Sequence, residues 1–202
     1  MTKSMYPVFE SIQYKDGTFC NLDYHIARMQ QTCIDLWGEK KNMDGLKARL
    51  KIGHKESLQK YKIYYDLHHE FVTYSPYYPR TIKQLYITDA DELQYPHKYT
   101  DRRTIDHFTQ DLPLDTDVLF VQQQLVSDSS YANLAFWDGK QWFTPEQPLL
   151  PGTKRAYLID TSQLIPAPIS ESDIHYFEKA CLINCMLDLN QVCIDTPHIL
   201  RR

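Results

Sequence analysis

HKYTDR at residues 97–102 is followed by SDSSYAN at residues 127–133 and by TPEQPLLPGTKR at residues 144–155. The first stretch carries Lys98, the second carries Asp128 among serines, and the third ends in a glycine, Gly152, that can open a helix. The three stretches supply an amine, a carboxylate and a helix start, in that order. Each stretch alone is weak evidence for a functional site. The interpretation depends on the presence of all three in this order along one chain.

These are the groups that hold pyridoxal 5'-phosphate (PLP). A lysine such as Lys98 forms a Schiff base with the aldehyde, which requires a neutral amine near pH 7. A carboxylate such as Asp128 keeps the pyridine nitrogen protonated, so that the ring withdraws electrons from the substrate. Taken singly, Lys98 could equally be a solvated surface lysine, and Asp128 could be a turn residue.

The phosphate of such a cofactor is expected at backbone N–H groups. The turn Gly152-Thr153-Lys154 precedes a predicted helix, and the N-terminus of a helix favours a phosphate. Asn184-Cys185 follows an apolar strand and could form a second turn facing the phosphate. Alone, the first turn is equally consistent with an ordinary helix start and the second with core. Lys154 would add a positive charge or point to solvent, and we favour solvent.

Composition excludes several other classes. The chain has 202 residues, 43% of them hydrophobic, and a net charge of −4, so no basic surface for nucleic acid is expected. No apolar run is long enough to span a membrane. The eight histidines do not cluster at ligand spacing, so no metal site is expected. Five cysteines, an odd number, suit a cytoplasmic protein better than a disulfide framework.

The pattern of hydrophobic residues predicts an α+β fold in two small lobes with mostly antiparallel sheets. We place the lobes at residues 1–80 and 81–202, and the second lobe would carry Lys98. Alternation and helical spacing predict strands over 6–14, 18–21, 61–67, 71–74, 82–87, 118–121, 134–138 and 141–143, and helices over 23–37, 44–52, 101–108, 153–159 and 170–177.

The chain resembles the class IV aminotransferase family, the fold-type-IV PLP enzymes related to D-amino-acid and branched-chain aminotransferases. FESI at 9–12 and HIARM at 25–29 resemble the first strand and helix of the family. KYTDR resembles the lysine motif of its lyase branch, VSDSSYANLAFW the strand with the acid, LLPGTKR the phosphate segment and LINCMLDLNQV a later lyase-branch motif. The resemblance covers about residues 9–192.

The resemblance implies a role for each matched residue. Lys98 would be the Schiff-base lysine, Arg28 would reach the cofactor phosphate, and Asp128 would replace the usual glutamate. Gln122-Gln123-Gln124 stands where the family has a glycine before that strand. The family's substrate loop is absent, so its groups that bind the substrate carboxylate cannot be carried over.

The activity implied by the lyase branch is the release of pyruvate from 4-amino-4-deoxychorismate, a small amino substrate, to give 4-aminobenzoate, a folate precursor. Two alternatives stay open: an amino-acid transaminase of class IV, and a shortened family member that acts as a binding protein. The resemblance also implies a homodimer.

Overall fold

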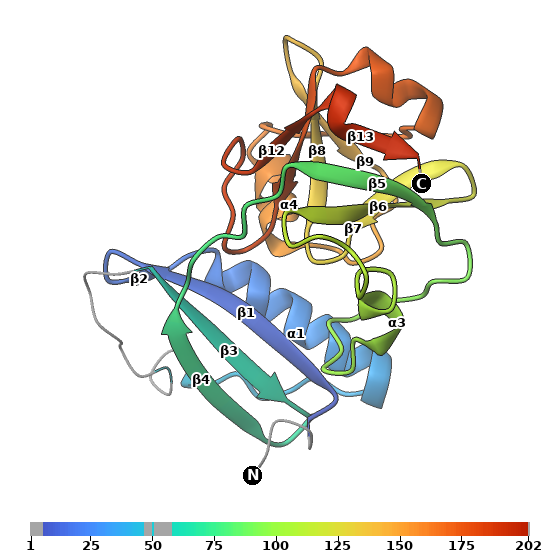
Figure 1. Ribbon diagram of the computed structural model, residues 1–202. Coiled ribbons are helices and arrows are strands. Elements are labelled where there is room, and N and C mark those ends of the chain that lie inside the picture. The colour runs from blue at the N-terminus through green and yellow to red at the C-terminus, as the bar shows by residue number, and fades with distance from the viewer. Residues whose placement is uncertain (1–5, 47–49, 51–57, 202) are drawn as a thin grey trace. The chain divides into compact units, whose positions relative to one another are not determined.

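A computed structural model describes residues 6–46, 50 and 58–201 (Figure 1). Its residue contacts divide the chain into two units, one formed by residues 1–78 and 97–101 and the other by residues 79–96 and 102–202. The structure thus groups Lys98 with the first unit, whereas the expected lobes assigned it to the second. The reason is local pairing: Tyr99 bridges to Val8, and the Phe9 amide donates to the Lys98 carbonyl at 2.9 Å.

In the described residues, the first unit contains a four-stranded antiparallel sheet and the long helix α1 (Figure 1). The strand order is β2-β1-β3-β4, with β1 at Val8–Lys15, β2 at Thr18–Phe19, β3 at Gln59–Tyr65 and β4 at Glu70–Pro76. Helix α1 spans Leu22–Trp37 and ends at Gly38, whose φ of 75° suits a glycine at a helix C-terminus. These elements follow the predicted ranges closely.

One face of this sheet packs on α1. Alternate side chains of β1 and β3 join Met29 and Cys33 of the helix in a buried cluster; the strand members are Val8, Ile12, Tyr14, Tyr61, Ile63 and Tyr65. The other face carries Phe9, Tyr64 and Phe71, with Tyr6 beside them. The sheet therefore presents two chemically distinct sides. The helix expected over 44–52 lies mainly outside the described residues, but Leu46 and Leu50 are buried as expected.

The second unit contains the longer sheet. Its strand order is β10-β9-β8-β7-β6-β5-β13, and β11 pairs with β8 and β12. The strands are β5 (Gln84–Asp89), β6 (Thr116–Gln122), β7 (Leu125–Ser129), β8 (Asn133–Trp137), β9 (Trp142–Pro145), β10 (Ile165–Ala167), β11 (Lys179–Ile183), β12 (Cys193–Asp195) and β13 (Ile199–Arg201). Most pairs are antiparallel, but β5 runs parallel to β6 and β13, and β9 parallel to β10.

The helices of this unit are short. They are α3 (Arg103–Asp106), α4 (Thr153–Asp160) and the 3-10 helices η2 (Glu171–Tyr176) and η3 (Thr196–His198). The range predicted as a helix over 170–177 is therefore a 3-10 helix with a capping box at Ser170. The fold as a whole is the mixed, mostly β architecture that the sequence predicts.

One expectation about the cysteines is wrong. The structure joins Cys181 and Cys193 in a disulfide, because the register of β11 and β12 sets the two residues directly opposite each other with their Cα atoms 4.0 Å apart. Cys20, Cys33 and Cys185 do not take part in a disulfide.

Candidate functional site

Lys98 lies beside an aromatic ring of the first unit. Because Val8 is paired with Tyr99, Lys98 stands opposite Phe9, and its Nζ lies 5.0 Å from the centroid of the Phe9 ring. The side chain is half-buried. The amine thus lies within cation–π distance of the ring, and the pairing of Val8 with Tyr99 positions its side chain beside β1.

Arg28 is held by a buried carboxylate on the helix side of the same sheet. Its Nε donates to Glu10 Oε1 at 2.9 Å and its Nη2 to Glu10 Oε2 at 2.6 Å, a bidentate pair. His25 Nδ1 lies 2.7 Å from Glu10 Oε2. Glu10 and His25 are almost fully buried, while 14% of the Arg28 side chain is exposed. The arginine is thus pre-oriented by a carboxylate that sequence reasoning had not singled out.

The ionisation of this cluster follows from its contacts. Burial would raise the pKa of Glu10, but Arg28 and His25 together lower it to about 2. Burial lowers the pKa of His25, although Glu10 opposes this. A neutral His25 that donates from Nδ1 to an ionised Glu10 satisfies both groups. The FE pair of the FESI motif was the signal in the sequence that could have identified Glu10.

Asp128 is a buried acid on β7 of the second unit. Its Oδ1 accepts from Asn133 Nδ2 at 2.8 Å and its Oδ2 from the Leu150 amide at 2.9 Å. Burial raises the pKa of Asp128 to about 7, against these hydrogen bonds and the charge of Arg155. A cation placed against the carboxylate would restore its charged form. Asp128 is therefore suited to hold a protonated pyridine nitrogen.

Gly152 brings the start of α4 against the same network. A Cβ at this position would lie 1.8 Å from Asn133 Oδ1, so only glycine permits the approach. Asn133 also donates to the Leu150 carbonyl at 2.9 Å. Asp128, Asn133 and the loop before Gly152 consequently form one connected group, and Thr153 is buried at the first position of the helix.

Lys154 does not point to solvent, contrary to our expectation. It is 7% exposed, and its Nζ lies 2.5 Å from Asp188 Oδ1. The reason is that α4 packs beside the turn after β11, whose Asp188 offers a carboxylate. The ammonium group of Lys154 is thus neutralised by Asp188 and does not serve as a second contact for the phosphate.

The Asn184-Cys185 turn is ordered by the Asn184 side chain. Its Oδ1 accepts from the Met186 amide at 2.8 Å, and its Nδ2 donates to the Tyr131 carbonyl at 3.3 Å. The turn thus lies against the loop that follows Asp128. Cys185 is half-buried.

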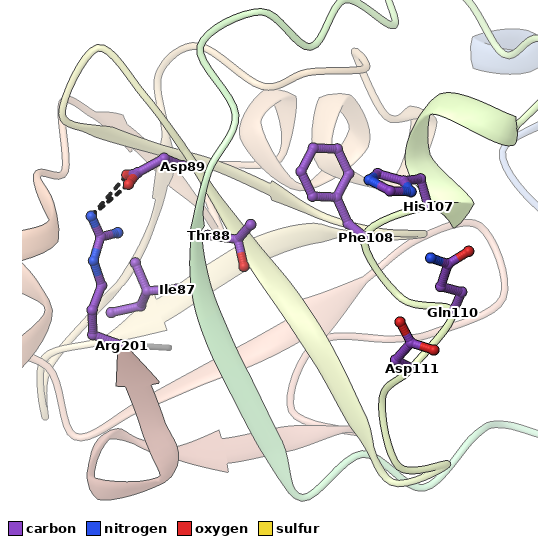
Figure 2. Close-up of a pocket in the computed structure, with 8 residues that line it drawn as sticks. All are labelled: Ile87, Thr88, Asp89, His107, Phe108, Gln110, Asp111 and Arg201. Carbon is purple, nitrogen blue, oxygen red and sulfur yellow. Dashed lines mark hydrogen bonds and ion pairs between the residues drawn. The ribbon is translucent and has the colours of Figure 1, made fainter.

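A separate pocket of about 460 Å³ opens in the second unit (Figure 2). Thr88 of β5 and His107, Phe108, Gln110 and Asp111 of the loop after α3 line it, and Arg201 reaches Asp89 at 2.7 Å on one side. None of the residues predicted from the sequence lies in this lining. Among the described residues, no group of three metal-ligating side chains comes together, and no helix is long and apolar enough to cross a membrane.

Comparison with known proteins gives a consistent result. The family model for amino-transferase class IV matches residues 7–193. A Haemophilus influenzae protein described as uncharacterized is 27% identical over 186 residues, which are 90% of this chain and 98% of that protein. A crystal structure from Haemophilus somnus 129PT, provisionally named 4-amino-4-deoxychorismate lyase, has a TM-score of 0.84 at 29% identity and covers 91% of this chain and 98% of its own.

A hypothetical aminotransferase of Mycobacterium tuberculosis, solved in its PLP-bound form, shares the fold with a TM-score of 0.74. It is 15% identical and covers 98% of this chain and 84% of its own. This likeness concerns the fold alone.

The side chains in each unit fit the cofactor of this family. The first unit offers a half-buried primary amine on Lys98 and an arginine fixed by a buried carboxylate. The second unit offers Asp128, a buried acid with a raised pKa whose charged form a neighbouring cation would stabilise. It also offers the N-terminus of α4, where Thr153 is buried. An aldehyde, a pyridinium nitrogen and a phosphate are the three groups that this set suits. The chain belongs to the amino-transferase class IV family and is a PLP-dependent enzyme.

Proposed function

We propose that this enzyme is a lyase that releases pyruvate from 4-amino-4-deoxychorismate and leaves 4-aminobenzoate, a precursor of folate. The observation that carries the proposal is the match to the Haemophilus somnus structure, at 29% identity over nearly the full length of both chains. The motif KYTDR around Lys98, which resembles the lyase branch of the family, supports it independently.

The proposed roles follow from each local environment. Lys98 would hold the cofactor through its amine and would act as the general acid and base that moves protons to and from the substrate. PLP, when bound, stores the electron pair that the substrate gives up. Asp128 holds the proton on the pyridine nitrogen, and Asn133 and the Leu150 amide keep the carboxylate in place.

Phosphate binding is proposed for Arg28, for the Gly152-Thr153-Lys154 turn and for the Asn184-Cys185 turn. Glu10 fixes the orientation of Arg28 before the cofactor arrives. At the two turns, backbone N–H groups act as donors. Because Lys154 is paired with Asp188, its contribution comes from the backbone. We further propose a homodimer, as the family resemblance suggests, and a location in the cytoplasm.

Product analysis tests the activity. The purified protein, loaded with PLP, is incubated with 4-amino-4-deoxychorismate, and 4-aminobenzoate is measured by its fluorescence and pyruvate by a coupled assay. Equal amounts of both, absent with Lys98→Ala, are expected.

The second candidate is a class IV transaminase, favoured by the match of residues 7–193 to the amino-transferase class IV family. Conversion of alanine and 2-oxoglutarate to pyruvate and glutamate, with no 4-aminobenzoate formed, would replace the lyase proposal with this one.

A further inference from the structure

Lys98 lies beside β1, where its charge also acts on His25 of α1, and the faces of the first sheet show which other side chains it meets. Paired residues of an antiparallel ladder place their side chains on the same face. Phe9 pairs with Tyr64 and Ser11 pairs with Lys62, so these four side chains share a face. Lys98, opposite Phe9, belongs to it as well. We call Phe9, Ser11, Lys62, Tyr64 and Lys98 the Lys98 face. Helix α1 packs on the other side.

Two amines flank one ring on this face. Lys98 Nζ lies 5.0 Å and Lys62 Nζ 5.5 Å from the centroid of the Phe9 ring. Both distances are within the range of a cation–π contact. The two amines therefore lie no farther apart than the sum of these two distances, so a substrate that reacts at Lys98 has a second cation in its vicinity.

We propose that Lys62 binds a carboxylate of the substrate that reacts at Lys98. This inference rests on the proposed function and deepens it, because it assigns a residue to the recognition of an anionic substrate. Lys62 is half-buried on β3, an interior strand of the sheet. A carboxylate that leaves water needs a charged donor, and an ammonium in such a position supplies it.

Lys60 provides a matched control on the same strand and face. It pairs with Gln13, four residues along β1 from Phe9, which is roughly 13 Å at the usual rise of a strand. Its Nζ lies over Tyr77, at 5.4 Å from that ring centroid. Lys60 and Lys62 thus share charge, burial class and strand, and differ in their distance from the Lys98 region.

The test uses two aminooxy probes that displace the Lys98 amine from bound PLP, aminooxyacetate with a carboxylate and O-methylhydroxylamine without one. Their rates are followed by the absorbance of the cofactor in the wild type, Lys62→Gln, Lys62→Arg and Lys60→Gln. We expect the wild type to prefer aminooxyacetate. The preference should fall about 10- to 100-fold in Lys62→Gln, the range for loss of a charge-assisted hydrogen bond. Lys62→Arg should retain most of it, and Lys60→Gln all of it.

A role of Lys62 in folding alone predicts a different pattern. It would lower PLP affinity and both probe rates together, whereas we expect PLP affinity in Lys62→Gln to equal that of the wild type. An unchanged preference in Lys62→Gln, an equal loss in Lys60→Gln, or a wild type without preference overturns the proposal. These results do not depend on which product the enzyme makes. If no 4-aminobenzoate is formed but the probe preference still depends on Lys62, the proposed lyase activity is wrong and the proposed carboxylate site is supported.

Discussion

At the scale of single residues, the two buried carboxylates respond to burial in opposite ways. Glu10 has a guanidinium and an imidazole against it, and these keep it ionised. Asp128 has an amide side chain and a backbone N–H, which compensate only part of the desolvation. Glu10 is therefore stable as an anion, whereas the anionic form of Asp128 needs a neighbouring cation for its stabilisation.

Glu10→Gln should destabilise the fold by about 1–3 kcal/mol, because Arg28 loses its charged acceptor. The pKa of Glu10 is lower in the folded chain than the ordinary 4.5, so its contribution is present above pH 4.5 and is lost as the pH falls toward 2. Urea denaturation between pH 3 and pH 7 checks this. The difference between wild type and variant should shrink on the acid side, and Glu92→Gln, at an exposed residue, should show none.

Asp128 should show the opposite dependence of stability on pH, and Asp128→Asn should remove it. Because burial raises its folded pKa from 3.8 to about 7, the cofactor-free wild type loses stability as the pH rises through that range. The variant lacks this pH dependence, so its stability relative to the wild type should increase between pH 4 and pH 8 by on the order of a few kcal/mol, although its single amide oxygen serves only one of the two donors. With PLP it should bind the cofactor and lose most turnover, since an uncharged amide does not hold the pyridinium proton. A variant with wild-type turnover would remove Asp128 from the mechanism.

At the scale of elements, the contact between α4 and β8 depends on the absence of a side chain. Gly152→Ala should displace Asn133, because the new Cβ would lie 1.8 Å from its Oδ1. We expect a loss of about 1–3 kcal/mol in unfolding free energy and weaker PLP binding. Adding Asn133→Ala should relieve the clash, so that the double variant is more stable than the sum of the single effects predicts. Additive effects would mean that the glycine matters for another reason.

The elements best predicted from sequence are those with strong periodicity. Strand β1 and helix α1 follow from alternation, from apolar residues at helical spacing, and from Gly38. Strand β7 is harder to predict from the sequence, because a run of polar residues normally indicates a loop. Its Ser127, Asp128 and Ser129 are polar yet buried. The turn before it uses Gln123 and Gln124 at φ of 50° and 69°, a conformation that glycine would signal.

Contacts between residues far apart in the sequence were the other features that sequence patterns did not predict. The ion pair of Lys154 with Asp188 and the disulfide of Cys181 with Cys193 depend on strand register, which a single sequence does not reveal. Lys98, Asp128 and Gly152, by contrast, were predicted from local motifs, because each of the proposed roles depends on its own short stretch.

At the scale of the whole molecule, the residues proposed for the cofactor are spread along the chain. Lys98 and Arg28 belong to the first unit, and Asp128, Gly152 and Asn184 to the second. PLP should therefore stabilise the chain as a ligand that binds only the folded state. Its binding makes the assignment of Lys98 directly measurable.

The most direct measurement is the site of cofactor attachment. The PLP-loaded protein is reduced with borohydride, digested, and analysed by mass spectrometry. The account predicts a phosphopyridoxyl group on Lys98 in the wild type and none at this site in Lys98→Ala, with Lys62→Gln labelled as in the wild type. A phosphopyridoxyl group on another lysine, or none in the wild type, would contradict it.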